Sequence, residues 1–226
     1  MDEEILADYL YEETEELKSF SASYESRSRD RFVSIVQEIY DLGSHEEYNT
    51  MFHTDRVLID KKPRRLMDYL EIEAFIDRIE IVSLNEIAVN SVMKSLKEEK
   101  GFDNVSFDEA KAKITVTLPP LSYNALIELK QAVEGKYKNY EKALIMVRNQ
   151  TAQQVRAGIQ NEYISSIDAA KVSKEIGLVG QHYLDGAKIF VMAKKHILLG
   201  KYEPEDDKEK ELAEKVPDAL VILGKA

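Results

Sequence analysis

The sequence predicts an α+β protein in which a three-helix bundle carries an inserted small α/β domain. Long segments with apolar residues at helical spacing lie before residue 44 and after residue 120. Between them, short aliphatic runs with the two-residue period of strands occupy residues 45–119. The last of these runs meets a double proline, Pro119-Pro120, through which neither a strand nor a helix can continue. Two differently built bodies therefore share one junction.

Composition limits the classes of function. The 226 residues are 44% hydrophobic and 32% charged, which suits one large or two modest folded domains. The sequence contains no run of eighteen apolar residues, so it predicts no membrane span. Because it contains no cysteine, disulfides and thiolate metal sites are excluded. The net charge of −11 argues against broad binding to a phosphate backbone, although a local basic patch is compatible with it.

The expected domain boundaries follow from which helices need one another. The first helix can bury its apolar face only against the two helices that follow residue 120, so the bundle closes around the insertion. We expect an acidic N-terminal extension at 1–20, the bundle at 21–44 and 120–201, the inserted α/β domain at 45–119, and a charged C-terminal extension at 202–226.

The N-terminal 17 residues predict a short amphipathic helix with one apolar side, formed by Ile5, Leu6, Tyr9, Leu10 and Leu17. Two interpretations are open: a solvated acidic helix or frayed extension, and a docking arm for a basic partner. The segment is acidic, unlike a secretory or transit peptide, so the protein works where it is made or a presequence has been removed.

Helical spacing predicts the first bundle helix from about Ser21 to Leu42, ended by Gly43. In the insertion we expect strands near Val57–Ile59, Leu70–Ile72, Ile79–Val82 and Ile114–Leu118, and one helix over Asn85–Lys100. After the prolines, a helix of about forty residues has an apolar seam with steps of three and four, formed by Leu126, Leu129, Val133, Tyr137, Tyr140, Leu144, Val147 and Thr151.

A turn near Gly158 leads to a last bundle helix, capped by Ser165 or Ser166 and ending near Gly200. We expect the tail to be a mobile extension or a short helix, with its final apolar residues packed back onto the protein. The tyrosines that follow the helical period are expected in the bundle core with their hydroxyls at its rim; they are Tyr123, Tyr137, Tyr140, Tyr163 and Tyr183.

The basic cluster Lys61, Lys62, Arg64 and Arg65 surrounds Pro63 on a turn of the insertion. It is interpreted as a solubilising loop, or as a contact with RNA or with an acidic protein partner. Lys194, Lys195 and His196 at the end of the last helix are expected to complement its dipole. The four histidines lack metal-ligand spacing and no catalytic motif occurs, so we expect no metal site, no cofactor and no enzymatic activity.

The order of helix, inserted α/β unit and two long helices, with three motifs in it, resembles the ribosome recycling factor family over about residues 21–201. The motifs are Leu118-Pro119-Pro120-Leu121-Ser122, Val147-Arg148-Asn149 and Tyr163-Ile164-Ser165. The resemblance implies an L-shaped, non-enzymatic translation factor that is a monomer outside the ribosome. Such a factor binds the large ribosomal subunit and acts with an elongation-factor-G-like GTPase to split the post-termination ribosome.

The resemblance also implies roles for individual residues. Arg148, Asn149 and Arg156 would contact ribosomal RNA from the bundle. Apart from the resemblance, their charge makes Lys61, Lys62, Arg64 and Arg65 candidate RNA contacts in the insertion. Gly43, Ser44, Pro119 and Pro120 lie in the two connections to the insertion, which allow a hinge of restricted direction. From the residues alone, Arg148 could instead be solvated or pair with Glu141 or Gln150. If Arg148 contacts RNA as the resemblance implies, Asn149 would hold the neighbouring helix or the arginine itself.

This chain departs from the family pattern where the family carries arginines at the end of the first helix. It has Tyr40-Asp41-Leu42-Gly43-Ser44-His45-Glu46, and it has Gln150-Thr151-Ala152-Gln153-Gln154 where further basic residues are usual. An alternative function is therefore a ribosome-associated structural protein, assembly protein or adaptor that keeps the fold without recycling activity. We expect a location in the mitochondrial matrix, with the cytoplasm or a plastid as alternatives.

Overall fold

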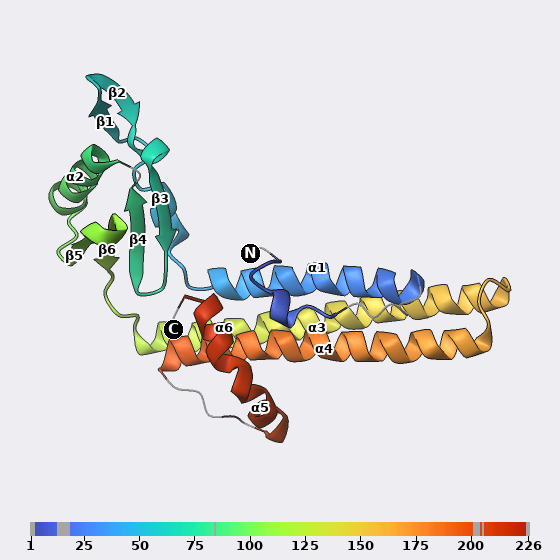
Figure 1. Ribbon diagram of the computed structural model, residues 1–226. Coiled ribbons are helices and arrows are strands. Elements are labelled where there is room, and N and C mark those ends of the chain that lie inside the picture. The colour runs from blue at the N-terminus through green and yellow to red at the C-terminus, as the bar shows by residue number, and fades with distance from the viewer. Residues whose placement is uncertain (1–2, 13–18, 84, 201–203, 205, 225–226) are drawn as a thin grey trace. The chain divides into compact units, whose positions relative to one another are not determined.

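The computed structural model describes residues 3–12, 19–83, 85–200, 204 and 206–224. The chain forms two compact units: a helical unit from Met1–Leu42 with Leu126–Ala226, and a small unit, Gly43–Ala125 (Figure 1). The small unit contains all six strands of the described chain and is inserted between the first and second bundle helices. The predicted class, an α+β protein with an α/β insertion in a three-helix bundle, is confirmed.

The bundle consists of α1 (Ser19–Asp41), α3 (Tyr123–Gln160) and α4 (Ser166–Leu199), which run side by side in Figure 1. The predicted seam of α3 faces inward, with Leu126, Leu129 and Tyr137 half-buried and the rest buried. The other two helices of the bundle bury aliphatic and aromatic residues as well, chiefly Phe32, Ile35, Val36, Ile39, Val172, Ile176, Val179, Tyr183 and Phe190.

Two glycines of α4 bring α1 and α4 close together. A Cβ added at Gly186 would lie 3.0 Å from the Phe32 ring, and one at Gly180 would lie 2.7 Å from the Tyr24 hydroxyl. Because these positions lack side chains, two large aromatic residues of α1 are fully buried against the backbone of α4.

The helix ends follow the predicted capping residues. The Ser165 hydroxyl accepts a hydrogen bond from the Asp168 amide over 3.1 Å and so caps α4, which closes at Gly200 with a φ of +75°. The helix α1 ends at Asp41, two residues before Gly43, whose φ is +76°.

The small unit has a four-stranded antiparallel sheet of order β3-β4-β6-β5, and a separate two-stranded sheet, β1-β2. The strands are β1 (Arg56–Ile59), β2 (Lys62–Arg65), β3 (Leu70–Ala74), β4 (Arg78–Ser83), β5 (Val105–Asp108) and β6 (Lys113–Thr117). Short 3-10 turns lie at Glu46–Thr50, Leu66–Tyr69 and Glu109–Lys111.

The predicted insertion helix is present as α2 (Glu86–Lys94), continued by a π-helical turn, Ser95–Glu99, and capped by the Asn85 side chain. Its apolar face packs on the sheet, and the core of the unit includes Ile79, Ile81, Val92, Leu96 and Ile114, all fully buried. The strands β2 and β5 were not predicted: KPRR lacks any apolar alternation, and VSFD alternates over only four residues, none of which is buried. Both strands form by backbone pairing with a neighbouring strand.

The prediction of an N-terminal amphipathic helix is wrong for the described residues 3–12. Only a 3-10 turn, Ala7–Tyr9, forms, and Leu10 is extended. Leu6 and Tyr9 are buried instead by tertiary contacts, while Ile5 is 53% exposed. The Tyr9 ring lies 4.9 Å from that of Phe190. The predicted helical residues beyond position 12 lie outside the described part of the chain.

The C-terminal residues pack on the bundle as two short helices, α5 (Asp207–Leu212) and α6 (Val216–Ile222), joined by a 3-10 turn, Ala213–Lys215. Val216, Ala219 and Leu223 are buried, as expected for the apolar end of the tail. The buried carboxylate of Glu209 forms an ion pair of 2.7 Å with Lys188 of α4. None of the described helices is long and apolar enough to cross a membrane.

Two of the predicted core tyrosines are exposed. Tyr140 and Tyr183 are buried and Tyr137 is half-buried, but Tyr123 is 74% and Tyr163 is 84% exposed. Both exposed residues lie at helix boundaries, the first at the start of α3 and the second in the turn before α4. The helical period therefore did not fix their environment.

Candidate nucleic-acid interface

The predicted RNA-binding residues of the bundle lie on the outer surface of α3. Val147 and Thr151 of the same helix are buried, whereas Arg148, Asn149 and Arg156 are exposed. Because α3 turns by about 100° per residue, a cation directly after a buried seam residue lies at the flank of the bundle. The position that the sequence predicted for Arg148, beside the seam, agrees with its exposure.

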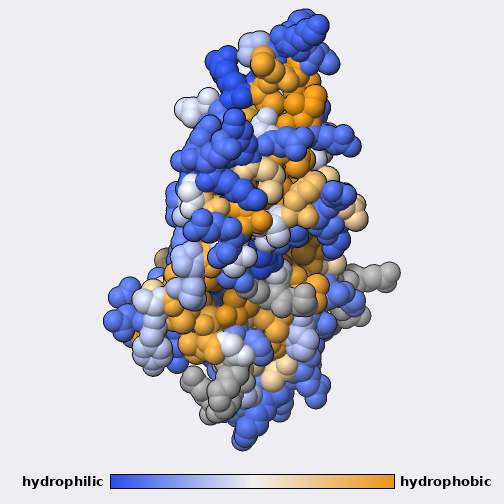
Figure 2. Space-filling model, turned by 90° about the vertical axis from the view of Figure 1, so that its left-hand side faces the viewer, coloured by the Kyte–Doolittle hydropathy of each residue, from blue (hydrophilic) through white to orange (hydrophobic). Residues whose placement is uncertain are grey.

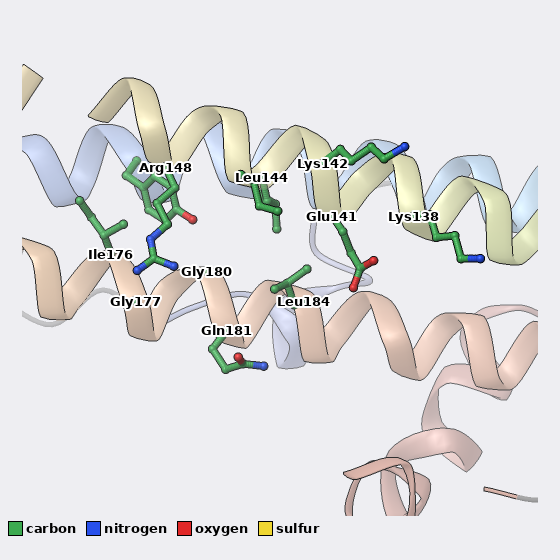
Figure 3. A pocket seen from close by; sticks show the side chains of 12 residues that line it. Lys138, Glu141, Lys142, Leu144, Arg148, Ile176, Gly177, Gly180, Gln181 and Leu184 are labelled. Carbon is green, nitrogen blue, oxygen red and sulfur yellow. The ribbon is translucent and has the colours of Figure 1, made fainter. Parts of the chain in front are cut away.

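A groove follows the line between α3 and α4, and we call it the α3–α4 groove. It has two parts, of about 390 Å³ and about 320 Å³, which share Arg148 and Ile176 in their linings. Leu144 and Leu184 face each other across the larger part (Figure 3). The α4 wall holds small or uncharged residues, among them Ala169, Ala170, Ser173, Gly177 and Gly180.

Cations of α3 border this groove along its length. Lys138 and Lys142 lie at one end, Arg148 in the middle and Arg156 in the smaller part, with Glu141 as the one acid among the lining residues that are described. Figure 3 shows the Arg148 side chain extending from α3 toward α4, beside Gly177 and Gly180. With no side chain at Gly177 and nothing within 4 Å of a Cβ placed there, the guanidinium has room above α4.

The partners that the sequence suggested for Arg148 interact with other residues. Gln150 Oε1 accepts a hydrogen bond of 3.4 Å from Arg27, and Glu141 interacts with Tyr137, whose pKa is raised mainly by burial and then by this carboxylate. Across the described residues, the Arg148 guanidinium forms neither an ion pair nor a hydrogen bond. Burial raises the pKa of Tyr24, and the positive charge of Arg148 partly offsets this increase.

Asn149 is exposed next to Arg148. Among the residues that the structure describes, the Asn149 side chain forms no hydrogen bond to the neighbouring helix or to the arginine. Its amide is therefore available to a ligand, together with the guanidinium beside it.

The second predicted set, Lys61, Lys62, Arg64 and Arg65, belongs to the small unit. These residues lie on the loop and second strand of the β1–β2 hairpin, and all four are exposed. The set is therefore carried by a different compact unit from Arg148, Asn149 and Arg156.

The predicted hinge residues lie at the borders of the small unit. Gly43 and Ser44 follow the end of α1, and Pro119 and Pro120 separate the end of β6 from the start of α3. Both prolines are exposed and lack an N–H, so neither adds a backbone hydrogen bond to the elements it separates.

Lys194 and Lys195 have structural contacts. Both are 4% exposed; Lys194 Nζ donates a hydrogen bond of 3.0 Å to the carbonyl of Tyr40, and Lys195 forms an ion pair of 2.8 Å with Glu134. The first contact satisfies a carbonyl at the C-terminal end of α1, and the second lowers the pKa of Glu134. Lys194 thus serves the C-terminal end of α1 and Lys195 a carboxylate within α3, whereas the sequence predicted that both complement the dipole of α4.

A buried polar network connects α1 with α4 and was not predicted. The Tyr183 hydroxyl donates a hydrogen bond of 2.5 Å to the buried carboxylate of Glu25, which also accepts two from Arg29, of 3.0 and 2.9 Å. The Tyr183 hydroxyl accepts a bond of 3.3 Å from the Tyr11 amide. A glutamate in a polar stretch gives no sequence signal of burial, because only the packing of α4 and the N-terminal segment covers it.

No group of three or more metal-binding side chains occurs among the residues with described positions. His182 lies under the N-terminal segment, with its Nε2 2.9 Å from the carbonyl oxygen of Tyr9. His45 lies 3.0 Å from a carboxylate oxygen of Glu47.

No protein-family model matches the chain, and no curated protein matches it. A solution structure of the ribosome recycling factor is similar at 15% identity and a TM-score of 0.47, covering 82% of this chain and 100% of that one. A second similar structure belongs to models of the T. thermophilus ribosome recycling factor and the E. coli elongation factor G bound to the E. coli post-termination complex. It has 14% identity and a TM-score of 0.47, and covers 80% of this chain and 97% of that one. At these values neither likeness establishes a common function.

Proposed function

We propose that this protein is a ribosome-binding, non-catalytic translation factor of the recycling-factor type, which contacts large-subunit RNA through the exposed flank of α3. The observation that carries the proposal is the position of Arg148: exposed, unpaired within the described chain, and adjacent to the free amide of Asn149. These are the residues to which the sequence resemblance assigns the RNA contact.

The chemistry of the α3 flank suits a phosphate backbone. A guanidinium donates two parallel hydrogen bonds to phosphate oxygens, and an amide supplies a further donor. Lys138, Lys142 and Arg156 extend the positive border in both directions from Arg148. Since the chain carries a net charge of −11, this local border provides attraction that the protein as a whole does not.

Recycling also requires a second domain that can move and a GTPase that drives the reaction. The small unit is attached through two chain connections, near Gly43–Ser44 and at Pro119-Pro120, which suit a hinge of restricted direction. The proposed partner is an elongation-factor-G-like GTPase. A subunit-splitting assay with that GTPase and GTP tests this step. If the wild-type protein binds ribosomal particles but does not split them, the recycling activity is rejected and the proposal of ribosome binding stands.

Co-sedimentation with ribosomal particles tests the binding itself. The wild-type protein is expected to migrate with large subunits, and Arg148→Gln to bind about tenfold more weakly at moderate salt through the loss of one phosphate contact. Arg31→Gln is the matched control, because Arg31 is an exposed arginine of α1 that does not line the α3–α4 groove. Failure of the wild-type protein to migrate with any ribosomal particle would reject the proposal.

A second candidate function is an adaptor that binds a protein and not RNA. The apolar lining of the α3–α4 groove favours it, since Leu144, Ile145 and Leu184 offer contacts that a phosphate backbone does not use. Particle binding that is unchanged in Arg148→Gln and insensitive to salt would support the adaptor.

We propose the mitochondrial matrix as the compartment. The support is the sequence itself, which lacks the usual arginines at the end of the first helix and has acidic segments at both ends. Fractionation of cells that express the tagged full-length protein, with protease protection of the organelle fraction, tests this location against the cytoplasm and plastids.

A further inference from the structure

The β1–β2 hairpin holds the most concentrated positive charge of the small unit. Its ten residues, Arg56–Arg65, contain five cations and one acid, Asp60, within a chain of net charge −11. The fifth cation, Arg56, precedes the four of the predicted cluster and lies directly opposite Arg65 in the strand register. All five are exposed.

Four of the six other cations of the same unit form ion pairs, whereas Lys97 and Lys111 form none with the described residues. Arg78 pairs with Asp77 and Glu80, Lys113 with Glu80, Lys100 with Asp55 and Lys94 with Glu98. Over the described residues, none of the hairpin cations forms an ion pair or a side-chain hydrogen bond. The unit has acids enough to pair its cations, yet the hairpin is left without them.

The register distributes the cations over both faces of the ribbon. Residues directly opposite each other project to the same side, so Arg56 and Arg65 share one face with Leu58 and Pro63. Lys62 and Arg64 lie on the other face, with Val57 and Ile59, and Lys61 occupies the two-residue loop. Asp60 and Lys61 have φ values of +52° and +62°, as in the tight loops that suit the twist of a hairpin.

Two like charges stand directly opposite each other in this arrangement. The Arg56–Arg65 pair is repulsive in the free protein, and an anion bound between the two side chains would relieve that repulsion. Packing of the small unit does not explain the pair, because both side chains are exposed.

The hairpin is a poor template for an added peptide strand. In a hairpin with a two-residue loop, the pair next to the loop is hydrogen-bonded, so the following pair, Leu58 and Pro63, points its backbone outward. Pro63 has no N–H to offer there, so the outer edge of β2 lacks a donor at its centre. An acidic peptide that adds a strand to β2 would lose that hydrogen bond.

We propose that the β1–β2 hairpin binds the phosphate backbone of structured RNA, with Arg56 and Arg65 on one face and Lys62 and Arg64 on the other. The face with Val57 and Ile59 packs on the small unit, but all five cations remain exposed along the ribbon and at its tip, so they can contact several phosphates, whereas a peptide would meet one edge. At the top of Figure 2, the region where Figure 1 shows the hairpin, hydrophilic residues adjoin apolar ones. Leu58, which is 66% exposed, offers an apolar contact beside the arginines. The inference rests on the small unit alone and is independent of the proposed function of the bundle.

Binding of the full-length protein to a mixed-sequence RNA duplex over a range of salt concentrations tests the proposal. Arg56→Gln/Arg65→Gln is expected to reduce the slope of log Kd against log salt by about two, and to weaken binding roughly thirtyfold at physiological salt. The double variant removes a repulsive pair and keeps the hydrophilic surface, so it is expected to fold; its circular dichroism and melting temperature verify this.

The matched control is Lys111→Gln/Lys215→Gln, which removes two exposed cations, one from each unit, and is expected to leave the slope unchanged. Equal slopes for Arg56→Gln/Arg65→Gln and the wild type would overturn the proposal. So would tighter binding of poly-glutamate than of the RNA duplex, which would identify an acidic protein as the ligand. Arg148→Gln in the same assay separates the two sites, because it leaves the hairpin intact.

Discussion

The hydroxyl of Tyr24 on α1 lies 2.7 Å from the point where a Cβ on Gly180 of α4 would stand. Tyr24 is 1% exposed, so its ring is packed within the bundle. The contact allows α1 and α4 to approach closely, and it forms part of the floor of the α3–α4 groove next to Arg148. Packing of the bundle and the shape of its candidate binding surface therefore depend on the same glycine.

Gly180→Ala is expected to destabilise the protein by about 1–3 kcal/mol, because the added methyl overlaps the buried Tyr24 hydroxyl, which must shift. Gly177→Ala is the matched control: nothing lies within 4 Å of its added Cβ, and alanine favours a helix over glycine by up to about 1 kcal/mol. Urea unfolding followed by circular dichroism measures both. A Gly180→Ala variant as stable as Gly177→Ala would mean that α1 and α4 do not approach this closely.

Glu25→Ala is expected to lower the free energy of unfolding by about 3 kcal/mol, because it leaves Arg29 and the Tyr183 hydroxyl without their buried acceptor. Glu38→Ala, also on α1, removes the carboxylate of an exposed ion pair with Lys136 and is expected to cost less than about 1 kcal/mol. Denaturant titration of both variants provides the measurement. Equal losses would contradict the burial of the network.

Tyr9→Ala tests whether the N-terminal segment belongs to the folded unit. Loss of the ring packed on Phe190 and of the hydroxyl bond to the Lys215 carbonyl is expected to cost about 3 kcal/mol. Ile5→Ala, at a position that is 53% exposed, is expected to change stability by less than about 0.5 kcal/mol. If both variants melt at the wild-type temperature, the segment is detached in solution.

Stability is expected to fall at alkaline pH. Burial is the main cause that raises the pKa of Tyr9 to about 12, and it also raises the pKa values of Tyr140 and Tyr183. These tyrosines stay protonated in the folded state above pH 10 while the unfolded chain loses their protons. Stability is therefore full below pH 10 and decreases above it by up to about 1.4 kcal/mol per pH unit for each such tyrosine. Urea unfolding between pH 8 and pH 11 measures this decrease, and Tyr9→Phe is expected to make it smaller.

Much of the fold could be predicted because local sequence patterns determine it. The seam from Val133 to Thr151 has the spacing of a helix packed along its length, and Pro119-Pro120 breaks the chain between strand and helix whatever surrounds it. Ser165 and Gly200 act through their own short-range geometry, so the ends of α4 also followed from the sequence. Exposure of Arg148 followed from its place directly after a buried seam residue.

Other features depended on partners distant in the chain. The strand β2 forms from KPRR because β1 supplies its hydrogen-bonding partner. The N-terminal residues are not helical, because Tyr9 packs on Phe190 of α4 and bonds to the Lys215 carbonyl. Burial of Glu25 likewise requires Tyr183, which is 158 residues away.

By itself, the sequence determined the fold class, the order of the two units along the chain and the two sets of cations available for binding. Periodicity, capping and proline geometry are local properties, and charge can be counted directly. Only the tertiary structure decided that Arg148 is unpaired beside a groove and that Arg56 completes the hairpin cluster opposite Arg65. Both facts depend on which acids come near, and proximity between residues distant in sequence is set by packing and strand register.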